Sequence, residues 1–99
     1  KQTMKKYAMM VLGDYDTERD TAEFVHGGML TRFVTVRDID EAKETAKKLL
    51  AEGFGCLEMC GAFGKENARM LAAETGGRMA IGYCVSDPDM EEKLTEFFG

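Results

Sequence analysis

Four short apolar segments alternate along the chain with four segments of helical character, and this alternation restricts the fold more than any other feature. The segments with the length and composition of strands are 7–12, 30–36, 55–60 and 79–85. The segments predicted to form helices are 17–26, 38–52, 65–75 and 86–98. Because short connections of this kind join parallel strands through right-handed crossovers, the pattern predicts an α/β domain of four β-α units.

The helix predicted over 38–52 has the clearest local signals. Asp38 followed by Glu41 forms a capping box, and Gly53 ends the helix. Its apolar stripe consists of Ile39, Ala42, Ala46, Leu49 and Leu50. The helix predicted over 17–26 has fewer apolar residues, and the glycine pair that follows it marks its end.

The predicted architecture is a four-stranded, mainly parallel sheet in the order 2-1-3-4, with helices on both faces, as in a doubly wound, flavodoxin-like fold. A half-barrel-like array of the same units is the alternative. Arg32 lies among the apolar positions of the second strand, which indicates an edge strand or a partly solvated one. Both arrangements leave strand edges unpaired, so we expect a homo-oligomer.

The length and charge of the chain limit its class. Its 99 residues predict a single domain over 1–99, in which 1–3 are interpreted as an extension before Met4. The net charge of −5 argues against nucleic acid as a partner, because such binding needs a positive field. No apolar run approaches the ~20 residues of a membrane-spanning helix. The segment 7–12 is too short for a signal peptide, so we expect a cytoplasmic protein.

The carboxyl ends of the predicted strands are the expected ligand-binding edge, because ligands of open parallel sheets bind there. The candidate ligand-binding residues at these ends are Asp14, Arg37, Gly61, Ala62, Phe63 and Gly64. Gly61 and Gly64 let the backbone turn into a helix, whose first N–H groups favour an anion. The turn lacks the dinucleotide and P-loop patterns, so a small carboxylate or phosphate is predicted in place of a nucleotide.

Glu58 and Cys60 are the candidate catalytic residues. Strand alternation places both on one face with Cys56. A carboxylate in a covered strand is paired, protonated or directed into a cavity, so Glu58 is either a general base or ligand contact, or a solvated or Arg-paired side chain. Cys60 is either a thiolate activated at a helix N-terminus or a small core residue.

The remaining chemistry of the chain is sparse. The single histidine, His26, is expected to interact with carbonyl groups at the end of the first helix. Cys56 and Cys60 are ~13 Å apart along a strand, too far to share a metal ion. Cys60 and Cys84 form a redox pair only if their strands are neighbours. No metal or other cofactor is predicted.

The segment Glu58-Met59-Cys60-Gly61-Ala62-Phe63-Gly64, together with Met4-Lys5-Lys6-Tyr7-Ala8, resembles a family of bacterial proteins of about this length that is catalogued as a domain of unknown function. The resemblance covers nearly the whole chain. It implies a small cytoplasmic α/β protein, and it implies no reaction, substrate or catalytic residue.

Three functions are hypotheses at this point. The first is a binding or regulatory module that holds a small anionic metabolite at the carboxyl edge of the sheet. The second is an enzyme that uses Cys60 as its nucleophile, assisted by Glu58 or Asp14. The third is a structural subunit whose role is to form a homo-oligomer.

Overall fold

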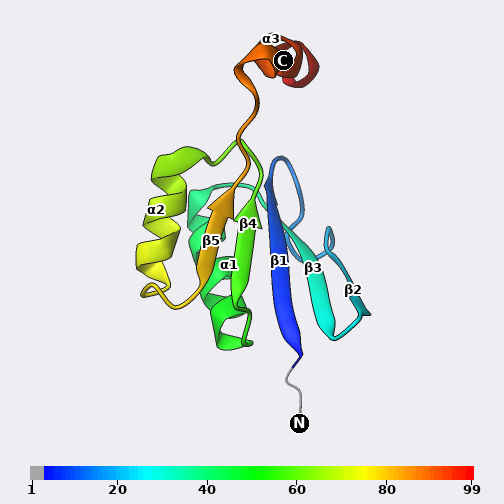
Figure 1. Ribbon diagram of the computed structural model, residues 1–99, viewed down its shortest axis with the longest axis vertical. Helices are drawn as coiled ribbons and strands as arrows, with labels where there is room; N and C mark the ends of the chain where they lie inside the picture. The colour runs from blue at the N-terminus through cyan, green and yellow to red at the C-terminus, as the bar shows by residue number, and fades with distance from the viewer. Residues whose placement is uncertain (1–3) are drawn as a thin grey trace.

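The computed structural model describes residues 4–99, so the extension predicted at 1–3 lies outside the described residues. Five strands form one sheet in the order β2-β3-β1-β4-β5, as Figure 1 shows. The strands are β1 (Lys5–Leu12), β2 (Ala22–His26), β3 (Met29–Val36), β4 (Cys56–Met59) and β5 (Ala80–Tyr83). The helices are α1 (Ile39–Ala51), α2 (Gly64–Glu74), the short 3₁₀ helix η1 (Pro88–Met90) and α3 (Glu91–Phe98).

The four predicted strands are present as β1, β3, β4 and β5, and they pair in parallel. Their order, β3-β1-β4-β5, confirms the predicted 2-1-3-4 arrangement of these strands. A half-barrel would place them in sequence order, so the observed order excludes that alternative. The sheet has a fifth strand at its edge, which makes it mostly parallel and corrects the prediction of four strands.

The helix predicted over 17–26 is wrong, because the second half of that segment is strand β2, which pairs antiparallel with β3. Gly27 and Gly28 connect the two strands with φ angles of 60° and 81°. Two consecutive residues with positive φ are typical of a type I′ hairpin turn, whose twist matches that of the strands. The glycine pair interpreted as a helix end is therefore the turn of a hairpin.

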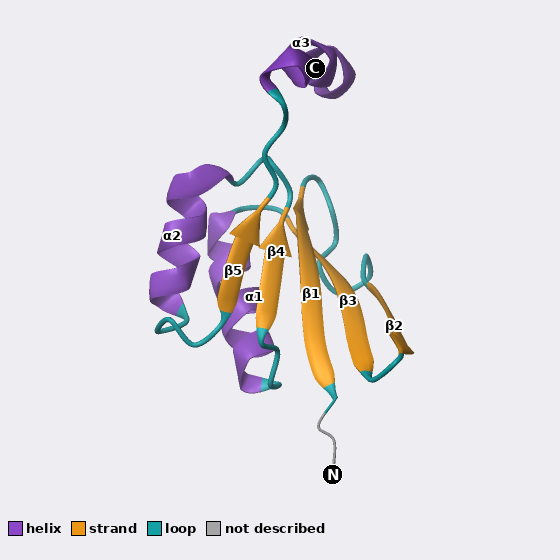
Figure 2. Cartoon of the chain, viewed as in Figure 1, coloured by secondary structure: helices purple, strands orange, loops and turns teal. Residues whose placement is uncertain are grey.

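Both α1 and α2 lie on the same face of the sheet (Figure 2), and together with the strands they enclose one hydrophobic core. The most buried side chains of that core include Met10, Leu49, Leu57 and Leu71. The predicted doubly wound arrangement is therefore wrong, and the domain has two layers. The reason is local, because the connection from β1 to β3 forms a hairpin in place of the helix that would cover the second face.

The opposite face of the sheet has no helix over it within residues 4–99 (Figure 2). Alternation along β1 and β3 places Met9 and Phe33 on this face, where they are register partners. Phe33 is 43% exposed, and Phe24 on β2 is 58% exposed. We name this surface the uncovered face.

Helix α1 forms as predicted. Its N-cap is Asp38, whose carboxylate accepts a hydrogen bond from the Glu41 N–H at 2.8 Å. Arg32 lies beside it on an interior strand and is partly solvated, one of the two outcomes predicted. Its guanidinium pairs with Glu52 at 3.0 Å and stands 4.7 Å from the ring centroid of Phe54.

The chain after β5 forms an arm, residues 84–99, that extends away from the carboxyl edge of the sheet (Figure 1). The arm contains η1, which Asp87 caps and which begins at Pro88, where the start of the last helix was predicted, and α3, which begins at Glu91. It contributes to a longest dimension of 48 Å, against 28 Å and 27 Å in the other directions. None of the helices within residues 4–99 has the length and apolar character needed to cross a membrane.

Candidate functional site

A cleft of about 900 Å³ lies where β1, β4 and β5 end, between the domain and the arm. This is the carboxyl edge of the parallel strands, where the topology predicts a site. Its lining consists of Val11, Leu12, Tyr15, Cys60, Gly61, Ala62, Gly64, Tyr83, Cys84, Val85, Ser86, Glu91, Leu94 and Phe98. Aliphatic, aromatic and small side chains dominate this set, and Glu91 is its only charged member.

The inner wall of the cleft is the turn from β4 into α2. Gly64 begins the helix with a φ of 71°, a conformation that favours glycine. No side chain described in residues 4–99 caps this helix end. Its first-turn N–H groups have no acceptor within the helix, so they are available to a ligand at Gly64.

Two thiols stand at this edge on neighbouring strands. The Leu12 N–H lies 3.4 Å from the Cys60 sulfur, which places Cys60 between the ends of β1 and β4. The Cys84 N–H donates to the carbonyl of Met59 at 2.9 Å. All three cysteines of the chain are free. Cys60 follows β4 and Cys84 follows β5, and these two strands are neighbours. This is the arrangement that a redox pair would require.

Four of the predicted residues, Cys60, Gly61, Ala62 and Gly64, line the cleft. Phe63 does not, because its side chain is 3% exposed and packs in the core.

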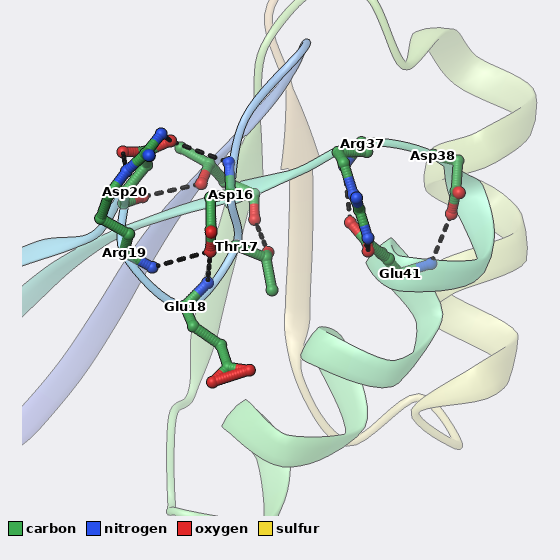
Figure 3. A network of polar contacts seen from close by, with 9 residues as sticks. Asp16, Thr17, Glu18, Arg19, Asp20, Arg37, Asp38 and Glu41 are labelled. Carbon is green, nitrogen blue, oxygen red and sulfur yellow. Dashed lines mark hydrogen bonds and ion pairs between the residues drawn. The ribbon is translucent and has the colours of Figure 1, made fainter.

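Asp14 and Arg37 also lie outside the lining. Figure 3 shows Arg37 turned toward Glu41, one helical turn away, and the two side chains form an ion pair of 2.6 Å. The pairing lowers the pKa of Glu41. Arg37 therefore binds within its own helix end and does not supply the cation predicted for a ligand.

The loop that follows β1 is held by its own carboxylates (Figure 3). Asp16 accepts hydrogen bonds from the N–H groups of Glu18 and Arg19, at 3.0 Å and 3.1 Å. Arg19 in turn pairs with Asp20 at 2.9 Å, and this hydrogen bond lowers the pKa of Asp20 to about 2. The loop also contains Tyr15, which contributes to the cleft.

Glu58 lies on the uncovered face and does not line the cleft. It is exposed to solvent, and its Oε1 accepts a hydrogen bond of 2.6 Å from the Tyr7 hydroxyl. This hydrogen bond, with partial burial, raises the pKa of Tyr7 to about 12. The prediction of a covered strand was wrong at this position, so Glu58 needs no partner among the arginines. Burial and the Glu58 charge also raise the pKa of the Cys56 thiol.

His26 lies at the hairpin, where it pairs in register with Met29, and Met29 is the register partner of Lys5 at the start of β1. This is the end of the sheet opposite Cys60, which follows the carboxyl end of β4. The imidazole is therefore not placed to act as a base for that thiol. The helix-end role expected for His26 is wrong, because the residue belongs to a strand.

Several lining residues were not among the predicted ones. Tyr15 follows a predicted strand end, a signal that would have identified it. Leu94 and Phe98 come from the arm, and Tyr83 from within β5. Their convergence depends on how distant segments pack, so no local pattern predicts it.

A second cavity of about 540 Å³ lies between α1 and the β2–β3 hairpin. Arg32, in its lining, is already paired with Glu23 at 2.7 Å and with Glu52. Because this guanidinium is engaged within the domain, the cavity is a weaker candidate for a ligand than the cleft at the carboxyl edge.

The comparison with known families identifies the chain. Residues 5–99 match the Family of unknown function (DUF6506), and the chain belongs to this family. Neither the curated proteins nor the solved structures contain a significant match to the chain.

Proposed function

We propose that this member of DUF6506 is a binding module for a small acid, a molecule with a mainly apolar body and one carboxylate or phosphate group. The observation that carries the proposal is the cleft of about 900 Å³ at the carboxyl edge, with an uncapped helix N-terminus in its inner wall. Pockets for small molecules commonly have volumes of about 300–1,000 Å³ and mainly apolar linings.

The apolar body of the ligand follows from the side chains that would surround it. Val11 and Leu12 from β1, with Tyr83 from β5, form the sheet side of the cleft. Leu94 and Phe98 of the arm stand opposite. Such side chains gain free energy by burying apolar surface, about 25 cal/mol for each Å² removed from water.

The acidic group follows from the turn into α2. Its free N–H groups carry partial positive charge, which is complementary to an anion at Gly64. Lys65 adds a full positive charge in the same turn, and it has no ion-pair partner within residues 4–99. A cation at a helix N-terminus is unfavourable alone and favourable once an anion is bound there.

The proposal is tested by thermal denaturation with matched pairs of probes, phenylacetate with phenylacetamide and 4-methylpentanoate with 4-methylpentanamide. At ten times its Kd, a ligand stabilises the folded state by about 1.4 kcal/mol. In a domain of this size we expect the acids to raise Tm by roughly 6–11 °C. The amides should raise it less, because they lack the charge.

The cleft is identified as the binding site by a matched pair of variants. Ala62→Trp fills the cleft from the turn and should abolish the shift, whereas Ala73→Trp, on the exposed side of α2, should retain it. The proposal is wrong if acids and amides give equal shifts, if no probe gives a shift at millimolar concentration, or if Ala62→Trp responds as the parent protein does.

A further inference from the structure

We propose that a second copy of this chain occupies the uncovered face, and that the α3 helix of each copy packs on the sheet of the other. Two apolar surfaces that are exposed to solvent within residues 4–99 support this proposal. One is the uncovered face, and the other is one side of α3. Leu94 and Phe98 of this side also line the cleft within one chain, so closure of the cleft by an arm and exchange of that arm are alternative arrangements.

The uncovered face is apolar mainly over β1, β3 and β2. Its side chains there include Tyr7, Met9, Val11, Phe24 and Phe33. Both phenylalanines are large hydrophobic residues exposed to solvent. Contiguous apolar surface of this kind on a small domain marks an interaction site.

The arm presents a complementary apolar stripe. Met90, Leu94, Phe97 and Phe98 follow one another at helical spacing, so they lie on one side of α3. Phe97 is 80% exposed and Phe98 79% exposed. A helix of eight residues is too short to be stable in water alone, so it needs a surface on which to pack this stripe.

The sheet of the same chain is a poor binding surface for the arm. Next to the base of the arm, the uncovered face presents Ala80, Gly82 and the carboxylate of Glu58, which offer little apolar area. The apolar strands β1, β3 and β2 lie about 10–19 Å farther across the sheet. The arm of another copy is not attached to β5 of this sheet, so it can reach these apolar strands.

The charge of the arm favours contact with a sheet over contact with another arm. Residues 86–99 contain five of the acidic residues and one basic residue, Lys93, and the whole chain has a net charge of −5. Most of the net negative charge is therefore on the arm. Two arms packed together would repel each other, whereas the uncovered face carries one basic and one acidic side chain, Lys5 and Glu58, and so presents no net negative charge to the arm.

The surface area that would be buried favours an arrangement in which two copies exchange their arms. The two phenylalanine rings offer roughly 300 Å², and Met90 and Leu94 raise the stripe to roughly 450 Å². An arm covers a similar area of sheet, so one docked arm buries roughly 900 Å² and two bury roughly 1,800 Å². Stable interfaces bury about 1,200–2,000 Å², a range that only the two-arm arrangement reaches. When two copies exchange their arms, both arms and both faces are occupied, so the assembly ends at a dimer.

The test is the mass in solution, measured by light scattering and sedimentation equilibrium on the full chain. We expect twice the 11.0 kDa of one chain at micromolar concentration. Phe97→Ser/Phe98→Ser removes the stripe and Phe24→Ser/Phe33→Ser removes its receptor, so each double variant should be monomeric. Val25→Ser is the control, because Val25 is 55% exposed and pairs with Leu30 on the opposite side of β2.

A mixing experiment identifies the exchange itself. The two double variants together have one intact arm and one intact face, so an equimolar mixture should associate at least tenfold more tightly than either alone. Circular dichroism checks that each variant is folded. A monomeric parent protein, a dimer that survives Phe24→Ser/Phe33→Ser, a dimer lost in Val25→Ser, or a mixture that associates no more tightly than either variant alone overturns the proposal. The acid-induced shift in Tm is measured in Phe24→Ser/Phe33→Ser, whose substituted residues lie outside the cleft lining, so a loss of dimer there leaves the ligand test intact.

Discussion

The hydroxyl of Tyr7 on β1 donates a hydrogen bond of 2.6 Å to Oε1 of Glu58 on β4, across the uncovered face. The Glu58 side chain lies over Gly82 of β5, where a Cβ would stand 3.4 Å from it. An added Cβ at this position would therefore meet the Glu58 side chain at ordinary van der Waals distance. One tyrosine, one carboxylate and one glycine connect three neighbouring strands on the side without helices.

Replacement of Glu58 tests the coupling within this pair. Because the hydrogen bond to the carboxylate and its charge favour the neutral phenol, Tyr7 titrates at a pKa of about 12. In Glu58→Gln the charge is absent, and the pKa of Tyr7 should fall toward its ordinary value of about 10. The measurement is phenolate absorbance against pH, taken as the difference between each protein and its Tyr7→Phe counterpart.

The raised pKa of Tyr7 also determines how the stability of the domain changes with pH. The folded state holds the Tyr7 proton more tightly than the unfolded state, so this contribution is complete below pH 10 and is lost as pH rises through about 12. In urea unfolding, the difference between the parent protein and Tyr7→Phe should shrink over that window. A difference that grows with pH would contradict the assignment.

Alanine at Gly28 tests the hairpin turn. Gly28 has a φ of 81°, which costs a residue with a Cβ about 1–2 kcal/mol. We expect Gly28→Ala to lower the free energy of unfolding by this amount. Gly55→Ala is the control, because Gly55 has no positive φ and nothing within 4 Å of an added Cβ. Equal effects of the two substitutions would argue against the turn.

Neighbouring residues of β4 test the two-layer arrangement. Leu57 is fully buried against the helices, whereas Cys56 points to the uncovered face. Leu57→Ala should cost about 2–5 kcal/mol in urea unfolding, because it leaves a cavity in the core. Cys56→Ala should cost less than about 1 kcal/mol. In a sheet with helices on both faces, the two costs would be similar.

Removal of the N-cap tests the start of α1. Asp38→Ala loses the hydrogen bond to the Glu41 N–H and should destabilise the domain by about 1 kcal/mol. Asp40→Ala keeps the cap and changes the charge of the same turn by an equal amount. If Asp40→Ala costs as much as Asp38→Ala, the effect comes from the helix dipole and the cap contributes little.

The parts of the fold that were predictable are those with signals close together in the sequence. Asp38 and Glu41 set the start of α1, and the apolar stripe of that helix indicates its buried side. The four parallel strands were recognisable as apolar runs, and their order was predicted by analogy with flavodoxin-like folds. Arg37 carried such a signal as well, since Glu41, four residues later in the first turn of α1, holds its guanidinium.

The fifth strand was not predictable, because Gly27-Gly28 is compatible both with a helix end and with a hairpin turn. What selects the strand is pairing with β3, through partners such as Phe24 and Thr31. The candidate site likewise has one part that could be predicted from the sequence and one part that could not. The turn from Cys60 to Gly64 is a local pattern, whereas the arm that faces it reaches the cleft only through the tertiary structure.

The β2–β3 hairpin also has a consequence for the order in which the sheet assembles. Val25 pairs with Leu30 across a two-residue turn, whereas Tyr7 must find Thr31 and Cys56 far along the chain. Closing a short loop costs less chain entropy than closing a long one, and hairpins form in about 1–10 μs. We therefore expect the hairpin to form early in folding and to present β3 as the template on which β1 is recruited.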